Sequence, residues 1–148
     1  MLAELLHPKR VSISIAVADK DAALRAISGL LVLPERAANE DTVCEVLGER
    51  ERLASTGVGS GVAIPHGRFD GFDELRAAVA VCPDGVDFSA VDGLPVTILV
   101  GIVGPRSMPQ RHLAALAGVS RVLRDVAIRD ALLAATDDDE AYRLLTRS

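Results

Sequence analysis

Apolar and polar residues alternate with two different periods in the first part of this chain of 148 residues. Between residues 11 and 17, Val or Ile alternates with Ser or Ala, which is the period of two that is typical of a β-strand. Between residues 20 and 33, large apolar side chains recur every three or four positions, as in an amphipathic helix. Asp19 lies where it can cap this helix, and Pro34 ends it.

The later part of the chain continues to alternate strand-like and helix-like segments. Short strands are predicted at 61–64 and 75–82, the second ending at the turn-forming residues 83–85. The apolar run 96–103 is rich in β-branched residues and predicts a central strand covered on both faces. Further helices are predicted from Asn39 or Asp41 to about Arg52, and over 109–124, 126–135 and 139–145.

This interleaving predicts an α/β fold. We expect a single domain, residues 1–148, in which a mixed β-sheet is flanked by helices on both faces. A chain of this length can bury roughly 70% of the surface that its unfolded form exposes. Hydrophobic residues make up 49% of the sequence, with three Phe, one Tyr and no Trp, so the core must be aliphatic.

Charge and cysteine content narrow the class of protein. The formal net charge of −5 argues against nucleic-acid binding and favours a partner with a basic face. Cys44 and Cys82 are too far apart to suggest a CxxC pair or a disulfide framework, which fits a reducing cytoplasm. The longest apolar run, residues 96–104, is far shorter than the ~20 residues that span a bilayer, so we expect no membrane insertion.

Reactive chemistry is concentrated in residues 50–68. Gly57, Gly59 and Gly61 alternate there, and glycine lets backbone N–H groups approach a ligand closely. A short apolar rise follows and stops at His66. We interpret His66 as a nucleophile set in an anion-binding loop.

A neutral imidazole can attack phosphorus and then pass the phosphoryl group on. Such transfer needs hydrogen-bond donors for the phosphoryl oxygens and a nearby positive charge. Thr56 and the backbone at Gly57 are the candidate donors, and Arg50 and Arg68 are the candidate cations. His112, at the start of a predicted helix, is a candidate to hydrogen-bond His66 or the bound phosphoryl group.

Other chemistries find less support in the sequence. The glycines fit neither the nucleotide P-loop nor the dinucleotide fingerprint, and no serine lies in G-x-S-x-G. A metal site would have to combine His66, His112 and a carboxylate such as Asp70, without any HExxH motif or clustered Cys and His. We therefore expect neither a metal nor a cofactor.

The segment RERLASTGVGSGVAIPHGR, residues 50–68, resembles the active-site segment of the enzyme IIA domains of the bacterial phosphoenolpyruvate phosphotransferase system. The resemblance is to the mannitol/fructose class, which includes the nitrogen-regulatory enzyme IIA. It extends to LLHPKRVSISIAVADKDAALRAISGLL near the start and to HLAALAGVSRVLRD further on, so it spans nearly the whole chain. Ala54 and Ser60 replace a common glycine and asparagine, and neither change removes a reactive group.

The resemblance implies the mannitol/fructose-type enzyme IIA fold and a set of site residues. His66 would carry the phosphoryl group as a tele-phosphohistidine, His112 would be the second active-site histidine, and Arg50 would approach the phosphoryl group. Thr56 matches the hydroxyl residue of the same loop.

The resemblance also implies partners. The donor would be a phosphocarrier protein of the HPr or NPr kind. Nitrogen-regulatory members act through their phosphorylation state on other proteins, such as potassium-transport or sensor components, and this is the function that we expect. A sugar-specific enzyme IIA that passes phosphate to an enzyme IIB remains an alternative, as does a binding module that transfers no phosphate.

Overall fold

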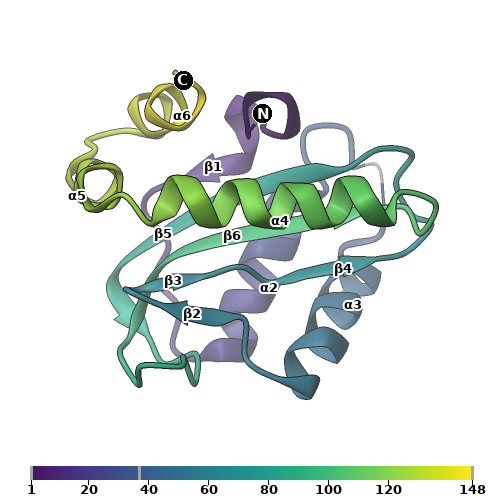
Figure 1. Ribbon diagram of the computed structural model, residues 1–148, viewed down its shortest axis with the longest axis horizontal. Helices are drawn as coiled ribbons and strands as arrows, with labels where there is room; N and C mark the ends of the chain where they lie inside the picture. Colours follow the sequence, from purple (N-terminus) through teal and green to yellow (C-terminus); the bar gives the residue numbers. More distant parts are fainter. Residues whose placement is uncertain (1, 37, 148) are drawn as a thin grey trace.

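The computed structural model describes residues 2–36 and 38–147, and it has the predicted α/β architecture (Figure 1). Its sheet has the strand order β1-β5-β6-β3-β2, and β4 pairs with β6 beyond the end of β3. The strands are β1 (Val11–Ser12), β2 (Gly57–Gly59), β3 (Val62–Ala63), β4 (His66–Arg68), β5 (Arg76–Val86) and β6 (Val96–Gly104).

Strand β6 is the centre of the sheet, as its apolar sequence predicts. It pairs antiparallel with β5 on one side and parallel with β3 and β4 on the other. Alternate side chains enter two separate core layers, because successive residues of a strand point to opposite faces. Ile98 and Ile102 belong to one layer, and Leu99 and Val103 belong to the other.

Helices cover both faces of the sheet, which confirms the expected arrangement (Figure 1). One core layer contains side chains of α2 (Lys20–Leu31) and α3 (Glu40–Leu53). The other contains side chains of the remaining helices, which are α1 (Leu2–Leu5), α4 (Pro109–Leu123), α5 (Val126–Ala134) and α6 (Asp138–Thr146). A short 3-10 turn, Pro8–Arg10, connects α1 to β1. Among the helices described here, none has the length and apolar character needed to cross a membrane.

The caps of α2 and α3 are those that the sequence indicates. The Asp19 carboxylate accepts a hydrogen bond from the Ala22 N–H, and the Asn39 side chain accepts from the N–H groups of Asp41 and Thr42. Each cap satisfies backbone donors that the first helical turn leaves unpaired. The boundary of α3, left open between Asn39 and Asp41, is thereby resolved with Asn39 as the cap.

Two predicted strands have different ends in the structure. The strand expected over 11–17 forms a regular ladder with β5 only at Val11–Ser12. The Ile13 N–H donates to the Asp138 carboxylate at the start of α6, which interrupts the ladder, although the Ile15 N–H still donates to the Val81 carbonyl of β5. The strand expected to stop before Pro83 continues to Val86. Its pairing with β6 is irregular after Val81, which absorbs the turn-forming residues without ending the strand.

Candidate active site

His66 lies on strand β4, and not in a loop as its glycine-rich surroundings suggested. The short strand is held parallel to β6, with His66 opposite Ile102 and Arg68 opposite Gly104. The Ile102 N–H donates to the Pro65 carbonyl at 3.0 Å, which anchors the chain just before the histidine. The half-buried imidazole is therefore carried by the central sheet.

One nitrogen of the His66 ring is engaged, and the other has no hydrogen bond within the part of the chain that the structure describes. Its Nδ1 lies 2.8 Å from the Ile64 carbonyl oxygen. A carbonyl oxygen only accepts hydrogen bonds, so Nδ1 carries the proton of the neutral ring and Nε2 keeps its lone pair. Burial lowers the pKa of His66 below its ordinary value, the Ile64 hydrogen bond opposes this effect, and the charge of Arg50 lowers the pKa further. The nucleophilic neutral form is thus favoured.

His112 is the second imidazole of the site and comes from the first turns of α4. Its ring centroid lies 5.6 Å from that of His66, and the two rings are tilted by 52°. The side chain is buried, and its Nδ1 has no hydrogen-bond partner among residues 2–36 and 38–147. Burial lowers the pKa of His112 to about 4, and His66 and Arg68 act in the same direction. Both imidazoles are therefore neutral near pH 7.

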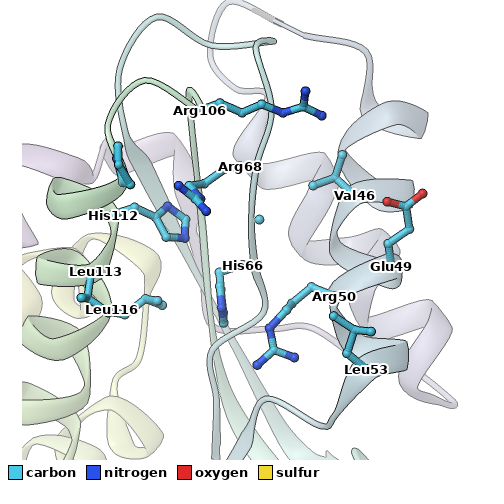
Figure 2. Close-up of a pocket in the computed structure, with 12 residues that line it drawn as sticks. Val46, Glu49, Arg50, Leu53, His66, Arg68, Arg106, His112, Leu113 and Leu116 are labelled. Carbon is cyan, nitrogen blue, oxygen red and sulfur yellow. The ribbon is translucent and has the colours of Figure 1, made fainter.

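A cleft of about 880 Å³ opens over the two histidines. It lies between α3, β4, α4 and the loop that follows β6, so its walls come from segments far apart in the sequence (Figure 2). Four of the predicted site residues meet here. The lining consists of Val46, Glu49, Arg50, Leu53, His66, Gly67, Arg68, Arg106, Pro109, His112, Leu113 and Leu116.

Two arginines approach the histidines from different elements. Arg50 is in the last turn of α3, where its Nη1 donates to the Ala54 carbonyl at 2.8 Å, and its guanidinium points toward His66 (Figure 2). Arg68 is two residues after His66 on the same strand, so both side chains leave the strand on one side. Its guanidinium lies near His112 (Figure 2). A phosphoryl group on Nε2 would enter a space with positive charge on both sides.

Thr56 and Gly57 do not line this cleft. Thr56 is buried, and both its hydroxyl and its N–H donate to the carboxylate of Glu51. The N–H of Gly57 donates to the Ser55 hydroxyl, and its carbonyl accepts from the Val91 N–H. These groups are used within the glycine-rich segment, so the geometry gives no support to their predicted role as phosphoryl donors.

Several residues of the cleft were not predicted to belong to the site. Arg106 lies in the turn just before the helix that carries His112, and that proximity in sequence was an available signal. Gly67 separates His66 from Arg68, and a Cβ at this position would collide with the Val46 side chain of α3. The apolar positions on α3 and α4 carried no local signal, because only the fold brings those helices to the same cleft. Within the described residues, no group of three or more His, Cys, Asp or Glu side chains forms a metal-binding arrangement.

The sequence model of one protein family matches residues 4–148. That family is described as the phosphoenolpyruvate-dependent sugar phosphotransferase system, EIIA 2. This chain belongs to the EIIA 2 family. The resemblance noted in residues 50–68 is therefore confirmed over almost the full sequence. Members of the EIIA 2 family act as phosphotransfer proteins, which agrees with a free imidazole nitrogen in a cleft lined with arginines.

Individual EIIA 2 relatives include both regulatory and transport proteins. A nitrogen regulatory protein of Bradyrhizobium diazoefficiens is 33% identical over 144 residues, which cover 97% of this chain and 94% of the relative. A fructose-specific EIIA component of Haloferax volcanii is 34% identical over 125 residues, which cover 84% of this chain and 81% of the relative. The crystal structure of nitrogen regulatory protein IIA-Ntr from Neisseria meningitidis matches with a TM-score of 0.89 at 30% identity, over 97% of this chain and 98% of that one.

Proposed function

We propose that this chain is a nitrogen-regulatory enzyme IIA, a single domain whose His66 accepts a phosphoryl group from the phosphohistidine of a phosphocarrier protein. The observation that carries the proposal is the hydrogen bond between His66 Nδ1 and the Ile64 carbonyl, which leaves Nε2 free inside the cleft. The phosphorylated and free forms would then bind different regulated proteins. A cytoplasmic location is part of the same proposal.

The transfer step follows from the state of the two rings. Nε2 of His66 attacks the phosphorus in line, a new P–N bond forms, and the P–N bond to the donor imidazole breaks. The electron pair of that bond stays on the donor ring. His66 neither gains nor loses a proton, because its Nδ1–H keeps the hydrogen bond to Ile64 throughout. The donor ring leaves as neutral imidazole because its other nitrogen already carries a proton. The tele nitrogen is therefore the one that carries the phosphoryl group.

The neighbouring side chains have separate tasks in this step. Arg50 and Arg68 offset the negative charge on the phosphoryl oxygens from two sides of the cleft. In its Nε2–H tautomer, the buried, neutral His112 can donate a hydrogen bond to one of those oxygens. Its low pKa favours this role, because a neutral imidazole donor adds no charge beside His66 before the phosphoryl group arrives.

The first experiment tests the acceptor. The protein is incubated with phosphoenolpyruvate, enzyme I and a phosphocarrier, and its intact mass is measured at neutral and acidic pH. We expect an acid-labile gain of one phosphate in the wild type and in His7→Ala, and none in His66→Ala. His7 is the matched control because it lies outside the cleft and its Nδ1 accepts from the Lys9 N–H. A phosphate retained by a folded His66→Ala protein contradicts the proposal.

The second experiment separates regulation from sugar transport, which the similarity to a fructose-specific EIIA keeps as an alternative. The phosphorylated protein is mixed with a purified enzyme IIB, and the phosphate on each protein is followed over time. Retention of the phosphate on His66 supports the regulatory role. The similarity to a nitrogen regulatory protein over 97% of this chain favours that outcome. Rapid loss to an enzyme IIB cysteine supports transport. A binding module without transfer chemistry would take up no phosphate in the first experiment.

A further inference from the structure

The cleft has the opposite charge to the molecule as a whole. The chain carries a formal net charge of −5, yet its cleft is lined by three arginines and one glutamate. Charge gathered in a concave surface focuses the electrostatic potential there. The net negative charge of the chain would attract a basic partner. The positive charge of the cleft would instead attract a partner whose docking face is acidic. The local charge decides docking because exposed charges further away than about 8 Å are screened by salt.

Arg106 differs from the other two arginines in its position. Arg50 points toward His66, and Arg68 lies near His112, whereas Arg106 extends along the edge of the cleft toward α3, away from both rings (Figure 2). It also lines an adjoining hollow with Asn39, Thr42 and Phe69. Arg106 is therefore placed to meet the surface of a docking protein and not the phosphoryl group on His66.

The Arg106 side chain is free while its backbone is fixed. Its N–H donates to the Asp70 carboxylate at 3.2 Å, which holds the turn between β6 and α4. Across residues 2–36 and 38–147, no hydrogen bond or ion pair engages its guanidinium. The exposed guanidinium thus keeps its donors for a partner, and arginine is well suited to a bidentate bond with a carboxylate.

Two exposed leucines in the cleft indicate that the expected partner is a protein. Leu53 on α3 is 82% exposed and Leu113 on α4 is 68% exposed, and both line the cleft. Exposed apolar residues flanked by charged ones form the usual plan of a protein interface, with an apolar centre and a polar rim. A small anion would use the arginines but leave both leucines in water.

We propose that Arg106 is a specificity-determining residue that pairs with a carboxylate on the rim of the docking face of the phosphocarrier. The chain thereby selects a donor whose phosphohistidine lies on an apolar patch with acidic residues at its edge. This inference rests on the proposed phosphoryl transfer. It adds a docking contact to that transfer and leaves the chemistry at His66 unchanged.

The test measures transfer from a purified, phosphorylated phosphocarrier in single turnovers. Arg106→Gln is compared with Arg121→Gln, an exposed arginine on α4 that does not line the cleft. We expect Arg106→Gln to lower the second-order rate constant about 3- to 10-fold and to flatten its salt dependence, because electrostatic contacts act mainly on association. The rate at saturating donor should stay within about 2-fold of the wild type, because Arg106 does not reach the phosphoryl group. Arg106→Lys should recover part of the loss.

A small donor separates this inference from the proposed function. Phosphoramidate gives its phosphoryl group to Nε2 with release of ammonia and has no protein surface. We expect Arg106→Gln to react with it at the wild-type rate, and His66→Ala not to react. Equal losses with both donors would place Arg106 on the phosphoryl group and overturn the docking role. Equal rates for Arg106→Gln and Arg121→Gln with the protein donor would also overturn it, while phosphorylation of His66 would leave the proposed function standing.

Discussion

At the level of the residue, the chemistry of His66 is set by its immediate surroundings. The A-I-P-H-G sequence was enough to single out this histidine, because no other segment combines glycines, hydroxyls and an imidazole so closely. The state of the ring was not predictable from sequence reasoning alone. It depends on the Ile64 carbonyl, two residues away, and on burial by elements that are distant in sequence. The distance of 5.6 Å between the ring centroids of His66 and His112 was likewise not predictable, because only folding brings these two segments together.

The lowered pKa of His66 leads to a first prediction. The neutral ring is the nucleophile, so the midpoint at which the transfer rate declines on lowering the pH should lie below the ordinary histidine pKa of 6.5. The chain has three histidines, so NMR of the ring protons can follow each one. Arg50→Gln should raise the pKa of His66, because the Arg50 charge lowers it. A His66 midpoint above 6.5 in the wild type would contradict this account.

His112 gives a second prediction, which concerns the free energy of unfolding. Its pKa is about 4 in the folded protein and 6.5 at its ordinary value, so between these pH values the unfolded chain binds a proton that the folded one does not. The contribution of His112 to stability is complete above pH 6.5 and is lost as the pH falls toward 4.

Urea unfolding of the wild type and His112→Gln over this pH interval measures the effect. Glutamine does not titrate, so the variant should lose less stability than the wild type between neutral pH and pH 4. The comparison uses the slope against pH, and a uniform loss of stability from the substitution does not affect it. Parallel slopes for the two proteins would show that His112 is not buried in its neutral form.

At the level of the element, helices were easier to predict than strands. The helices from α2 onward have strong apolar periodicity and local caps such as Asp19 and Asn39, so their ends lie within about two residues of the predicted ones. The short α1 was not predicted. Strands β2, which is Gly-Val-Gly, and β4, which is His-Gly-Arg, lack a strand-like apolar pattern and were missed. They exist because distant or neighbouring strands offer pairing partners, β3 for β2 and β6 for β4, which a local pattern does not reveal. The early end of β1 was likewise not predictable from a local pattern, because it depends on the distant Asp138, which accepts from the Ile13 N–H.

Gly67 tests how closely β4 and α3 pack. A methyl group at this position would collide with Val46, so Gly67→Ala should lower the free energy of unfolding by about 1–3 kcal/mol and slow phosphorylation of His66. Adding Val46→Ala should recover part of both losses because it removes the obstructing side chain. Urea unfolding and the mass assay measure the two effects. If the double variant is no better than Gly67→Ala alone, the contact with Val46 is not the cause.

At the level of the whole molecule, one buried carboxylate joins three parts of the fold. Glu51 of α3 accepts from the N–H and hydroxyl of Thr56 in the glycine-rich segment, and its Oε1 lies 2.8 Å from Lys20 Nζ at the start of α2. The structure has the predicted α/β class, and its core is mostly aliphatic, with Phe72 and Phe88 also buried in it. This link was not predicted, because Glu51 belongs to the charge run 49–52, which by itself indicates a solvated helix face.

Glu51→Gln provides the corresponding prediction. The substitution keeps the shape of the side chain but removes the charge that faces Lys20, so we expect a loss of about 1–3 kcal/mol in the free energy of unfolding. Glu49→Gln, at an exposed position of the same helix, should change it by less than about 0.5 kcal/mol. Urea unfolding at neutral pH measures both variants. Equal effects would mean that the buried carboxylate has no special part in holding the three segments together.

The alternation of side chains along β4 limits which changes in chain length the site can tolerate. His66 and Arg68 leave the strand on one side, and Gly67 faces Val46 on the other. Inserting or deleting one residue between Ile64 and His66 would rotate the imidazole to the side of Val46, where even a methyl group does not fit. Substitutions around the cleft can alter partner choice gradually, but a shift of one residue removes the nucleophile at once.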